Sequence, residues 1–180
     1  MAKASSSRST NAAKPKGRRL RTRLALTVAA SSTLLLTFAI AATPASADTS
    51  GSISGYGGLC LDDRAASTAN YNAIQVYTCN GTGAQQWTEV SAGSTLQVLG
   101  KCLDVNGGGT GDGTPVDLFD CNGTGAQVWI PQSNGAFYNP QSNKCLDDTN
   151  WSTTPGTQAQ IWDCSGNANQ SWSFGSLGRD

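Results

Sequence analysis

The sequence predicts an all-β domain built from three copies of one unit that close around a common axis. One nine-residue stretch, CNGTGAQQW at residues 79–87, returns as CNGTGAQVW at 121–129 and as CSGNANQSW at 164–172. The tryptophan that ends each stretch, and a cysteine that precedes it in each copy, recur at steps of 42 and then 43 residues. A period of this length indicates one supersecondary unit whose core is complete only when the copies pack together.

Each copy is predicted to contain short strands and turns, because no window shows sustained helical periodicity. The β-favouring runs IQVY at 74–77 and VDLF at 116–119 lie between clusters of Gly, Asn, Asp, Ser and Thr. Asn-Gly at 80–81 and at 122–123 is typical of tight turns. An open stack of repeats would need capping units, whereas a barrel leaves no free sheet edge. We therefore expect the three copies to close on themselves.

The first 47 residues have the pattern of a secretory signal peptide. Eight basic residues and no acidic ones come first, an apolar run from Leu24 to Ala42 follows, and small residues end the segment at Ala47. An apolar run of about 19 residues barely spans a bilayer, so we favour cleavage after Ala47 over an uncleaved anchor helix. The predicted product is a secreted, extracellular domain of residues 48–180, with repeats at about 54–90, 96–131 and 136–174.

The charge of this mature chain argues against two classes of partner. It keeps four basic and twelve acidic residues, a net charge of −8. An acidic surface that is poor in Lys and Arg does not attract phosphate backbones or anionic lipids. Nucleic acid and, after signal cleavage, membrane are therefore not expected as partners, and we expect a monomer.

All six cysteines follow residue 47, as in the disulfide frameworks of secreted proteins. Six cysteines allow fifteen pairings in principle. One local pairing rule used three times is the simplest prediction, with one disulfide in each copy. The sequence has no CxxC motif and no histidine, so neither a metal site nor a cofactor is expected. The predicted pairs, each 19 residues apart, are Cys60 with Cys79, Cys102 with Cys121, and Cys145 with Cys164.

Together these motifs resemble the ricin B-type lectin domain. Each copy has Cys-Leu-Asp, an aromatic residue two positions before the second cysteine, and then Gln-x-Trp, and the likeness extends from about Ser54 to Phe174. The resemblance implies a β-trefoil of three repeats of about 42 residues with pseudo-threefold symmetry, and it implies sugar binding. The tryptophans, which occupy the same place in every copy, are expected to fill the shared core rather than bind sugar: Trp87, Trp129 and Trp172.

The aromatic residue before each second cysteine is predicted to face outward. Side chains alternate between the two faces of a strand, so Ile74 and Val76 point one way while Gln75 and Tyr77 point the other. The same alternation places Phe119 and Trp162 on the polar faces of their strands, together with Asp117 and Gln160. A ring in this position can stack on the C–H face of a sugar whose hydroxyls bond to polar neighbours.

The aspartate after each Cys-Leu is the second element of the predicted site. A carboxylate can accept charge-assisted hydrogen bonds from two neighbouring hydroxyls, although an aspartate here is equally typical of a turn cap. In the resembled family this aspartate is the main sugar ligand, and the other polar ligands lie in an Asn-Gln pair near the Gln-x-Trp. The three aspartates are Asp62, Asp104 and Asp147.

The three predicted sites differ in how fully they match this pattern. Site three alone has the Asn-Gln pair, and Trp151 in a nearby loop extends it. Site one is partial, with alanine before its glutamine, and site two departs most, because Asp117 replaces an amide and Phe119 lacks a polar tip. The predicted sugar-binding residues are Asp147, Gln160, Trp162, Asn169 and Gln170 in site three, Asp62, Gln75, Tyr77 and Gln85 in site one, and Asp104, Phe119 and Gln127 in site two.

The leading functional prediction is a lectin that binds a polysaccharide such as xylan or a galactose-type glycan. A glycosidase is an alternative, but it needs two carboxylates flanking one bond, and adjacent aspartates such as Asp62 and Asp63 alternate between faces. A protein-binding trefoil, such as a protease inhibitor or a defence protein, is the other alternative. Such a protein usually works through one loop, which gives no reason to repeat the ring and the acid in all three copies.

Overall fold

Thirteen short strands and seven single-turn 3-10 helices form the part of the chain that the computed structural model describes, residues 48–91 and 94–176. The predicted signal peptide, residues 1–47, lies outside these described residues. The strands are β1 (Thr49–Ser54), β2 (Cys60–Asp63), β3 (Asn72–Tyr77), β4 (Trp87–Val90), β5 (Thr95–Val98), β6 (Lys101–Val105), β7 (Thr114–Phe119), β8 (Ile130–Pro131), β9 (Phe137–Asn139), β10 (Lys144–Asp147), β11 (Thr157–Gln158), β12 (Gln160–Trp162) and β13 (Ser173–Ser176). The 3-10 helices are η1 (Tyr56–Gly58), η2 (Arg64–Ala66), η3 (Gly83–Gln85), η4 (Asn106–Gly108), η5 (Gly125–Gln127), η6 (Thr149–Trp151) and η7 (Ala168–Gln170).

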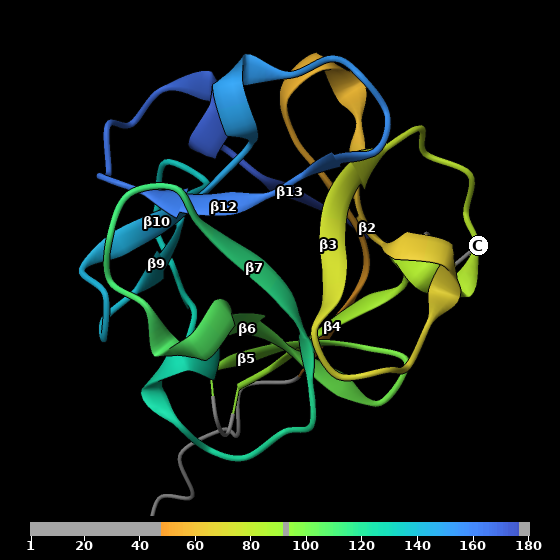
Figure 1. Cartoon of the computed structure of the whole chain (residues 1–180). Helices are drawn as coiled ribbons and strands as arrows, with labels where there is room; N and C mark the ends of the chain where they lie inside the picture. The colour runs from red at the N-terminus through yellow and green to blue at the C-terminus, as the bar shows by residue number, and fades with distance from the viewer. Residues whose placement is uncertain (1–47, 92–93, 177–180) are drawn as a thin grey trace, which may run out of the picture. The chain divides into compact units, whose positions relative to one another are not determined.

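Each repeat contributes one hairpin to a threefold cap. The hairpins pair β2 with β3, β6 with β7, and β10 with β12. Strands β3, β7 and β12 meet around the centre of Figure 1, and one equivalent backbone hydrogen bond runs from each repeat to the next, beside others that have no counterpart in every repeat. The three equivalent bonds are Tyr71 N to Leu118 O at 2.8 Å, Gly113 N to Ile161 O at 3.0 Å, and Gly156 N to Val76 O at 2.8 Å.

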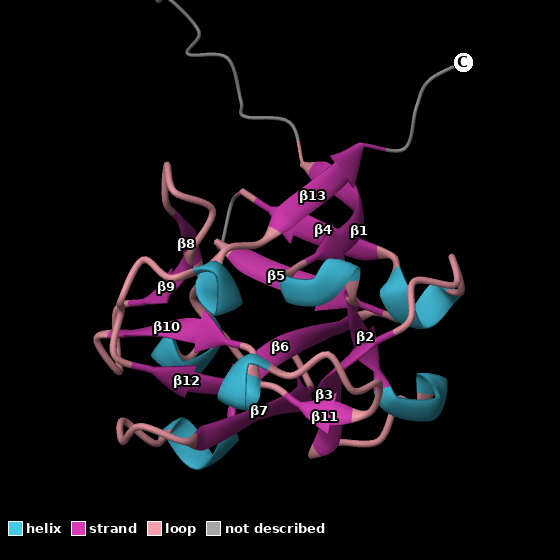
Figure 2. Cartoon of the chain, turned by 90° about the horizontal axis from the view of Figure 1, so that it is seen from above, coloured by secondary structure: helices cyan, strands magenta, loops and turns pink. Residues whose placement is uncertain are grey.

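The remaining strands close the other end of the domain. Strand β1 pairs with both β4 and β13, so the first and last described strands lie side by side, with Ile53 opposite Phe174. Figure 2 places β1, β4 and β13 at the end opposite β3, β7 and β11. The predicted closure of three β-rich copies into one barrel-like β-trefoil is confirmed.

The repeated tryptophans fill the core, as predicted. Trp87 and Trp129 are fully buried, and Trp172 is 5 % exposed. Burying an indole leaves its N–H in need of an acceptor, and each one donates to the carbonyl of the leucine that follows the first cysteine of its repeat. The bonds are Trp87 Nε1 to Leu61 O at 2.9 Å, Trp129 Nε1 to Leu103 O at 3.0 Å, and Trp172 Nε1 to Leu146 O at 3.1 Å.

The predicted disulfide framework is also confirmed. Cys60 bonds to Cys79, and the other two repeats have the same pairing across 19 residues, Cys102–Cys121 and Cys145–Cys164. Closing a loop of about 20 residues restricts the unfolded chain and contributes about 3 kcal/mol per bond. Three such bonds indicate folding in an oxidising environment.

Candidate functional site

Each repeat has one surface pocket lined by its Cys-Leu-Asp aspartate and by the aromatic residue before its second cysteine. The hairpin register explains this arrangement: in repeat one, Asp62 lies opposite Gln75 and Cys60 opposite Tyr77. The acid, the polar residue and the ring therefore share one face of the hairpin. The pockets have volumes of about 560 Å³ in site one, 380 Å³ in site two and 250 Å³ in site three.

The rings of sites one and three point to solvent, as the alternation predicted. Tyr77 is 39 % exposed and Trp162 is 44 % exposed, whereas Ile74 and Val76 on the opposite face are fully buried. Phe119 of site two is less exposed than either. Its ring lies edge-on to that of Tyr71, with the centroids 4.9 Å apart.

Asp147 forms the floor of site three. It is 3 % exposed, and three side-chain amides hold its two oxygens in place. Gln160 Nε2 donates to Oδ1 at 3.0 Å, while Asn169 Nδ2 and Gln170 Nε2 donate to Oδ2 at 2.7 and 2.9 Å. Burial raises the pKa of Asp147, and the three hydrogen bonds oppose that rise by favouring the ionised form. The result is an oriented carboxylate beside an exposed indole.

Trp151 was assigned to this site only because it is close to Asp147 in the sequence. It lines the same pocket. It lies on η6 and is 45 % exposed. Its ring packs edge-on against Tyr56 with centroids 5.3 Å apart. Site three therefore has two exposed indoles, Trp151 and Trp162, around one carboxylate.

Site one has a shorter version of the same network. Gln75 Nε2 donates to Asp62 Oδ1 at 2.8 Å, and Gln85 Nε2 donates to Asp62 Oδ2 at 3.0 Å. Arg64 Nε in turn donates to Gln75 Oε1 at 3.0 Å, so the amide is fixed from both ends. Ala84 occupies the place of Asn169, which removes one donor to the acid.

The glutamines of the first two Gln-x-Trp motifs lie behind their pockets, whereas Gln170 of the third lines site three. Gln85 and Gln127 are fully buried. They therefore expose no surface for the direct contact with sugar that the sequence predicted for them. Their side chains hold the turn after the second cysteine instead: Gln85 Oε1 accepts from Asn80 N at 2.8 Å, and its amide donates to Thr78 O at 3.0 Å. Gln127 and Gln170 make the equivalent bonds in their repeats.

Site two differs because two acids face each other. Asp104 and Asp117 are cross-strand partners, and they are 6 % and 1 % exposed. Burial raises the pKa of Asp104, and it raises the pKa of Asp117 to about 6, with the charge of Asp104 adding to the rise and a hydrogen bond from Asn106 opposing it. Asp104 lines the pocket, whereas Asp117 lies behind it.

Neighbouring repeats also contribute to the pockets, which local motifs did not reveal. Tyr71 of repeat one lines site two, and Gly156 of repeat three lines site one. Gly113 of repeat two comes within 3.8 Å of Trp162, measured from the position of a Cβ at Gly113. These three residues are the donors of the threefold backbone bonds in the cap. The cap therefore places one residue of another repeat at the pocket of Tyr77, beside Phe119 and beside Trp162.

A second acid lies behind site three. Asp148 is fully buried, and neither of its carboxylate oxygens has a hydrogen-bond partner with good geometry. Burial, with a further contribution from the charge of Asp147, raises the pKa of Asp148 to about 7, and the nearby backbone N–H of Ser152 opposes the rise. The equivalent Asp63 in repeat one also has a raised pKa, caused mainly by burial, and it accepts a bond from Asn72 at 2.6 Å.

Neither a metal-binding cluster nor a membrane-spanning helix is found in the described residues, 48–91 and 94–176. No group of three or more His, Cys, Asp or Glu side chains within these ranges is arranged to hold a metal ion. None of the helices in the same ranges has the length and apolar character needed to cross a bilayer.

Comparisons with known proteins are consistent with this geometry. The family profile described as the ricin-type beta-trefoil lectin domain matches residues 49–176. Among curated proteins none matches the chain. A designed 3-fold symmetric protein, ThreeFoil, is similar in structure, with a TM-score of 0.66 and 29 % identity over 71 % of this chain and 99 % of that one.

Two natural proteins with similar structures are larger than the matched region. A non-toxic homologue of type II RIPs from Momordica charantia, solved in complex with α-methyl-D-galactoside, has a TM-score of 0.64 and 27 % identity over 72 % of this chain and 48 % of that one. An exo-beta-1,3-galactanase from Clostridium thermocellum has a TM-score of 0.65 and 26 % identity over 74 % of this chain and 31 % of that one. The present chain thus spans about half of the first protein and a third of the second.

Proposed function

Because the chain belongs to the ricin-type β-trefoil lectin domain family, we propose that it is a secreted lectin that binds neutral glycans through up to three shallow sites. The observation that carries this proposal is the repeated pairing of a ring and a buried carboxylate in one pocket of each repeat. The ring covers the apolar face of a pyranose, while the carboxylate and nearby amides accept and donate hydrogen bonds at its edge.

Site three is the strongest of the proposed sites. Asp147 has three amide donors that fix its orientation, so little ordering remains to be done when a sugar binds. Trp162 and Trp151 give the pocket two exposed indoles. In this proposal Gln170 acts as a positioning residue and Asn169 lies at the pocket wall.

Galactose-bearing glycans are the proposed target class, with xylan-type polysaccharides as the second candidate. The Momordica protein and the galactanase support the first choice through the galactose-based molecules in their names. One ring and a few hydrogen bonds give single-sugar affinities at about the millimolar level, which is about −4 kcal/mol. Two or three sites on one rigid domain raise the affinity for a polymer through effective concentration.

The contribution of the Trp162 ring follows from its exposure. Trp162 is 44 % exposed, so about 110 Å² of a side chain of roughly 250 Å² faces solvent. A sugar on one face covers about half of that area. At about 25 cal/mol per Å² the stacking is worth about 1.4 kcal/mol, which is a tenfold change in Kd.

Affinity electrophoresis through gels containing galactomannan or arabinoxylan tests the proposal. Trp162→Ala is expected to weaken retardation by about tenfold in apparent affinity, and Asp147→Ala to abolish the contribution of site three. Leu99→Ala is the matched control, because it removes an apolar side chain that is 39 % exposed and lies outside all three pockets. Equal migration of Trp162→Ala, Leu99→Ala and the wild type in every gel contradicts the proposed function of site three.

A further inference from the structure

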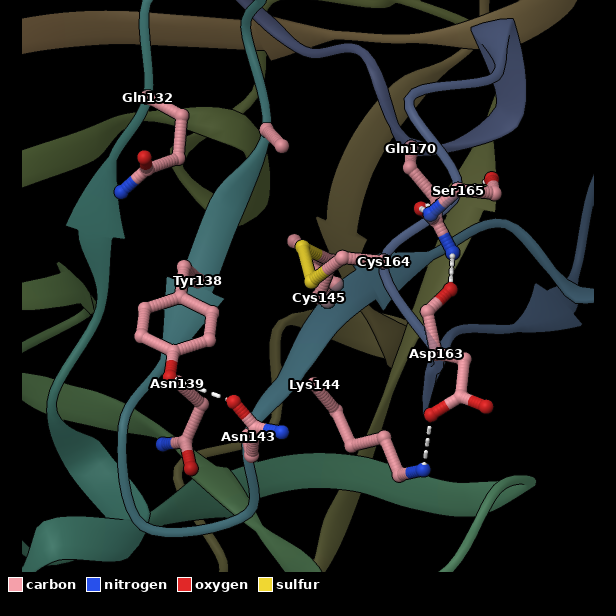
Figure 3. The surroundings of a disulfide bond; sticks show 12 residues. Gln132, Tyr138, Asn139, Asn143, Lys144, Cys145, Asp163, Cys164, Ser165 and Gln170 are labelled. Atoms are coloured by element: carbon pink, nitrogen blue, oxygen red, sulfur yellow. Dashed lines mark hydrogen bonds and ion pairs between the residues drawn. A yellow bond between two sulfur atoms is a disulfide. The ribbon is translucent and has the colours of Figure 1, made fainter.

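A hollow of about 800 Å³, larger than any of the three repeated sites, lies between the β8–β9 hairpin and the Cys145–Cys164 disulfide. Figure 3 shows Tyr138 and Asn143 on one side of this disulfide and Asp163 on the other. We propose that this hollow, the hairpin pocket, is a fourth binding site that takes one or two units of a neutral oligosaccharide. The inference adds a site to the proposed lectin function and does not use the repeated acid-and-ring motif.

The apolar wall of the hairpin pocket is formed by a cross-strand pair. Ile130 on β8 lies opposite Tyr138 on β9, so the two side chains share one face. Ile130 is 40 % exposed, and Ala136 continues the wall. The hydroxyl of Tyr138 donates to Asn143 Oδ1 at 2.8 Å, which fixes the ring (Figure 3). A fixed aromatic ring beside an aliphatic side chain is a platform for the C–H face of a sugar.

The polar rim of the pocket consists largely of neutral groups. Gln132, Asn134 and Asn143 present amides, and Asn134 uses its Oδ1 to accept from Ala136 N at 3.1 Å, which leaves its two N–H donors available. The acid on the rim, Asp163, is paired with Lys144. Neutral donors and acceptors around an apolar wall match a polyhydroxylated, uncharged ligand better than a phosphate or a cation.

The second cysteine segment of repeat three separates the hairpin pocket from site three. Trp162, Ser165 and Asn167 line site three, whereas Asp163, Cys164 and Gly166 line the hairpin pocket. One ridge of chain thus has a pocket on each side. On the near side Gly166 lies close to Asn134, since a Cβ at Gly166 would be 3.8 Å from Asn134 Nδ2. A glycan held in site three brings its further units to this ridge at high effective concentration.

The structure of the repeat does not require this apolar wall. In the corresponding β4–β5 hairpin the equivalent cross-strand pair is Thr88 opposite Gln97. Gln97 lies opposite Cys102 just as Tyr138 lies opposite Cys145. Since a polar pair fits the same register there, the fold does not require the half-buried Tyr138 and the exposed Ile130 at these positions, and in this proposal ligand contact accounts for them.

Titrations of the protein followed by ¹H–¹⁵N correlation spectra test this site, with methyl α-D-galactoside, lactose and xylohexaose as probes. In the wild type, at least one probe is expected to shift amides around Tyr138, Asn134 and Asn143, in addition to those around Trp162. Tyr138→Gln installs the residue of the β4–β5 hairpin. It is expected to raise the Kd obtained from the hairpin-pocket shifts about tenfold and to leave the Kd obtained from the shifts around Trp162 unchanged. Tyr138→Phe keeps the ring and is expected to lose less affinity at the hairpin pocket than Tyr138→Gln.

The outcomes separate the two proposals. Shifts confined to the amides around Trp162, or hairpin-pocket shifts that persist in Tyr138→Gln, overturn the fourth site and leave the three-site function standing. Shifts confined to the hairpin pocket support the fourth site and count against site three. No response to any of the three probes overturns both.

Discussion

The acid pair of site two leads to a prediction about stability. Asp117 faces Asp104 across the hairpin, at the position where site one has Gln75. Gln75 donates to its own aspartate and accepts from Arg64, and Asn106 donates to Asp117 Oδ2 in the corresponding way at 2.5 Å. Asp117→Gln therefore keeps an acceptor for Asn106, adds a donor for Asp104 and removes one buried charge.

The magnitude follows from the pKa of Asp117. An aspartate whose folded pKa is raised keeps a proton that the unfolded chain has already released, so stability falls as the pH rises from its ordinary value of 3.8 to the raised value of about 6. A difference of about two pKa units at about 1.4 kcal/mol each gives an upper limit of about 3 kcal/mol. Above about pH 6, Asp117→Gln is expected to be more stable than the wild type by up to about 3 kcal/mol in the free energy of unfolding. Below pH 3.8 the two proteins are expected to differ little.

Urea unfolding with the disulfides intact, followed by tryptophan fluorescence between about pH 4 and pH 8, measures this difference. Gln75→Asp combined with Arg64→Asn installs in site one the acid pair and the neutral donor of site two, and it is expected to lose stability over the same pH range. If Asp117→Gln gives a constant difference from the wild type at every pH, or if the double variant creates no new pH dependence, the acid pair is not the source of the effect and the reasoning is refuted.

Two further predictions concern the groups behind the pockets. Asp148→Asn is expected to stabilise the domain above about pH 7 and to change little at pH 4, because burial and the charge of Asp147 raise the pKa of Asp148 to about 7; the same urea series measures it, and a gain that is equal at both pH values contradicts it. Gln85→Ala is expected to cost about 2–4 kcal/mol, because it leaves Asn80 N and Thr78 O without their buried partner. Gln86→Ala, at the half-buried next position, is the control and is expected to change stability by about 0.5 kcal/mol or less; equal losses in the two variants would show that the buried amide has no special role.

The sequence was sufficient to predict the fold because the relevant signals are local and occur three times. The spacing of Cys60 to Cys79 predicted a disulfide that the structure contains, and the alternation in IQVY predicted that Ile74 is buried and Tyr77 exposed. Both signals depend only on neighbours along one hairpin, where the strand period fixes the face of each side chain. The resemblance to the lectin family added the connection between the repeats.

The parts of the sites that the sequence did not reveal come from contacts between repeats. Tyr71 reaches Phe119 because its backbone N–H donates to Leu118 O in the cap. No motif in repeat one indicates that its residue will line a pocket of repeat two. The sequence also did not reveal the role of Gln85. A glutamine that lines a pocket and a glutamine buried behind it have the same sequence motif, and only the burial of Gln85 in the structure distinguishes the two cases.

The distribution of identical and different residues over the three repeats indicates which groups hold the fold and which select the ligand. Four buried groups are the same in each copy: the tryptophan, its leucine carbonyl acceptor, the glutamine of the turn and the disulfide. The groups at the pocket rim differ, since the ring is Tyr77, Phe119 or Trp162 and its neighbour from another repeat is a glycine or Tyr71. A requirement for folding alone would act equally on all three copies. We therefore propose that the differences at the rim give the three proposed sites different sugar preferences on one common scaffold.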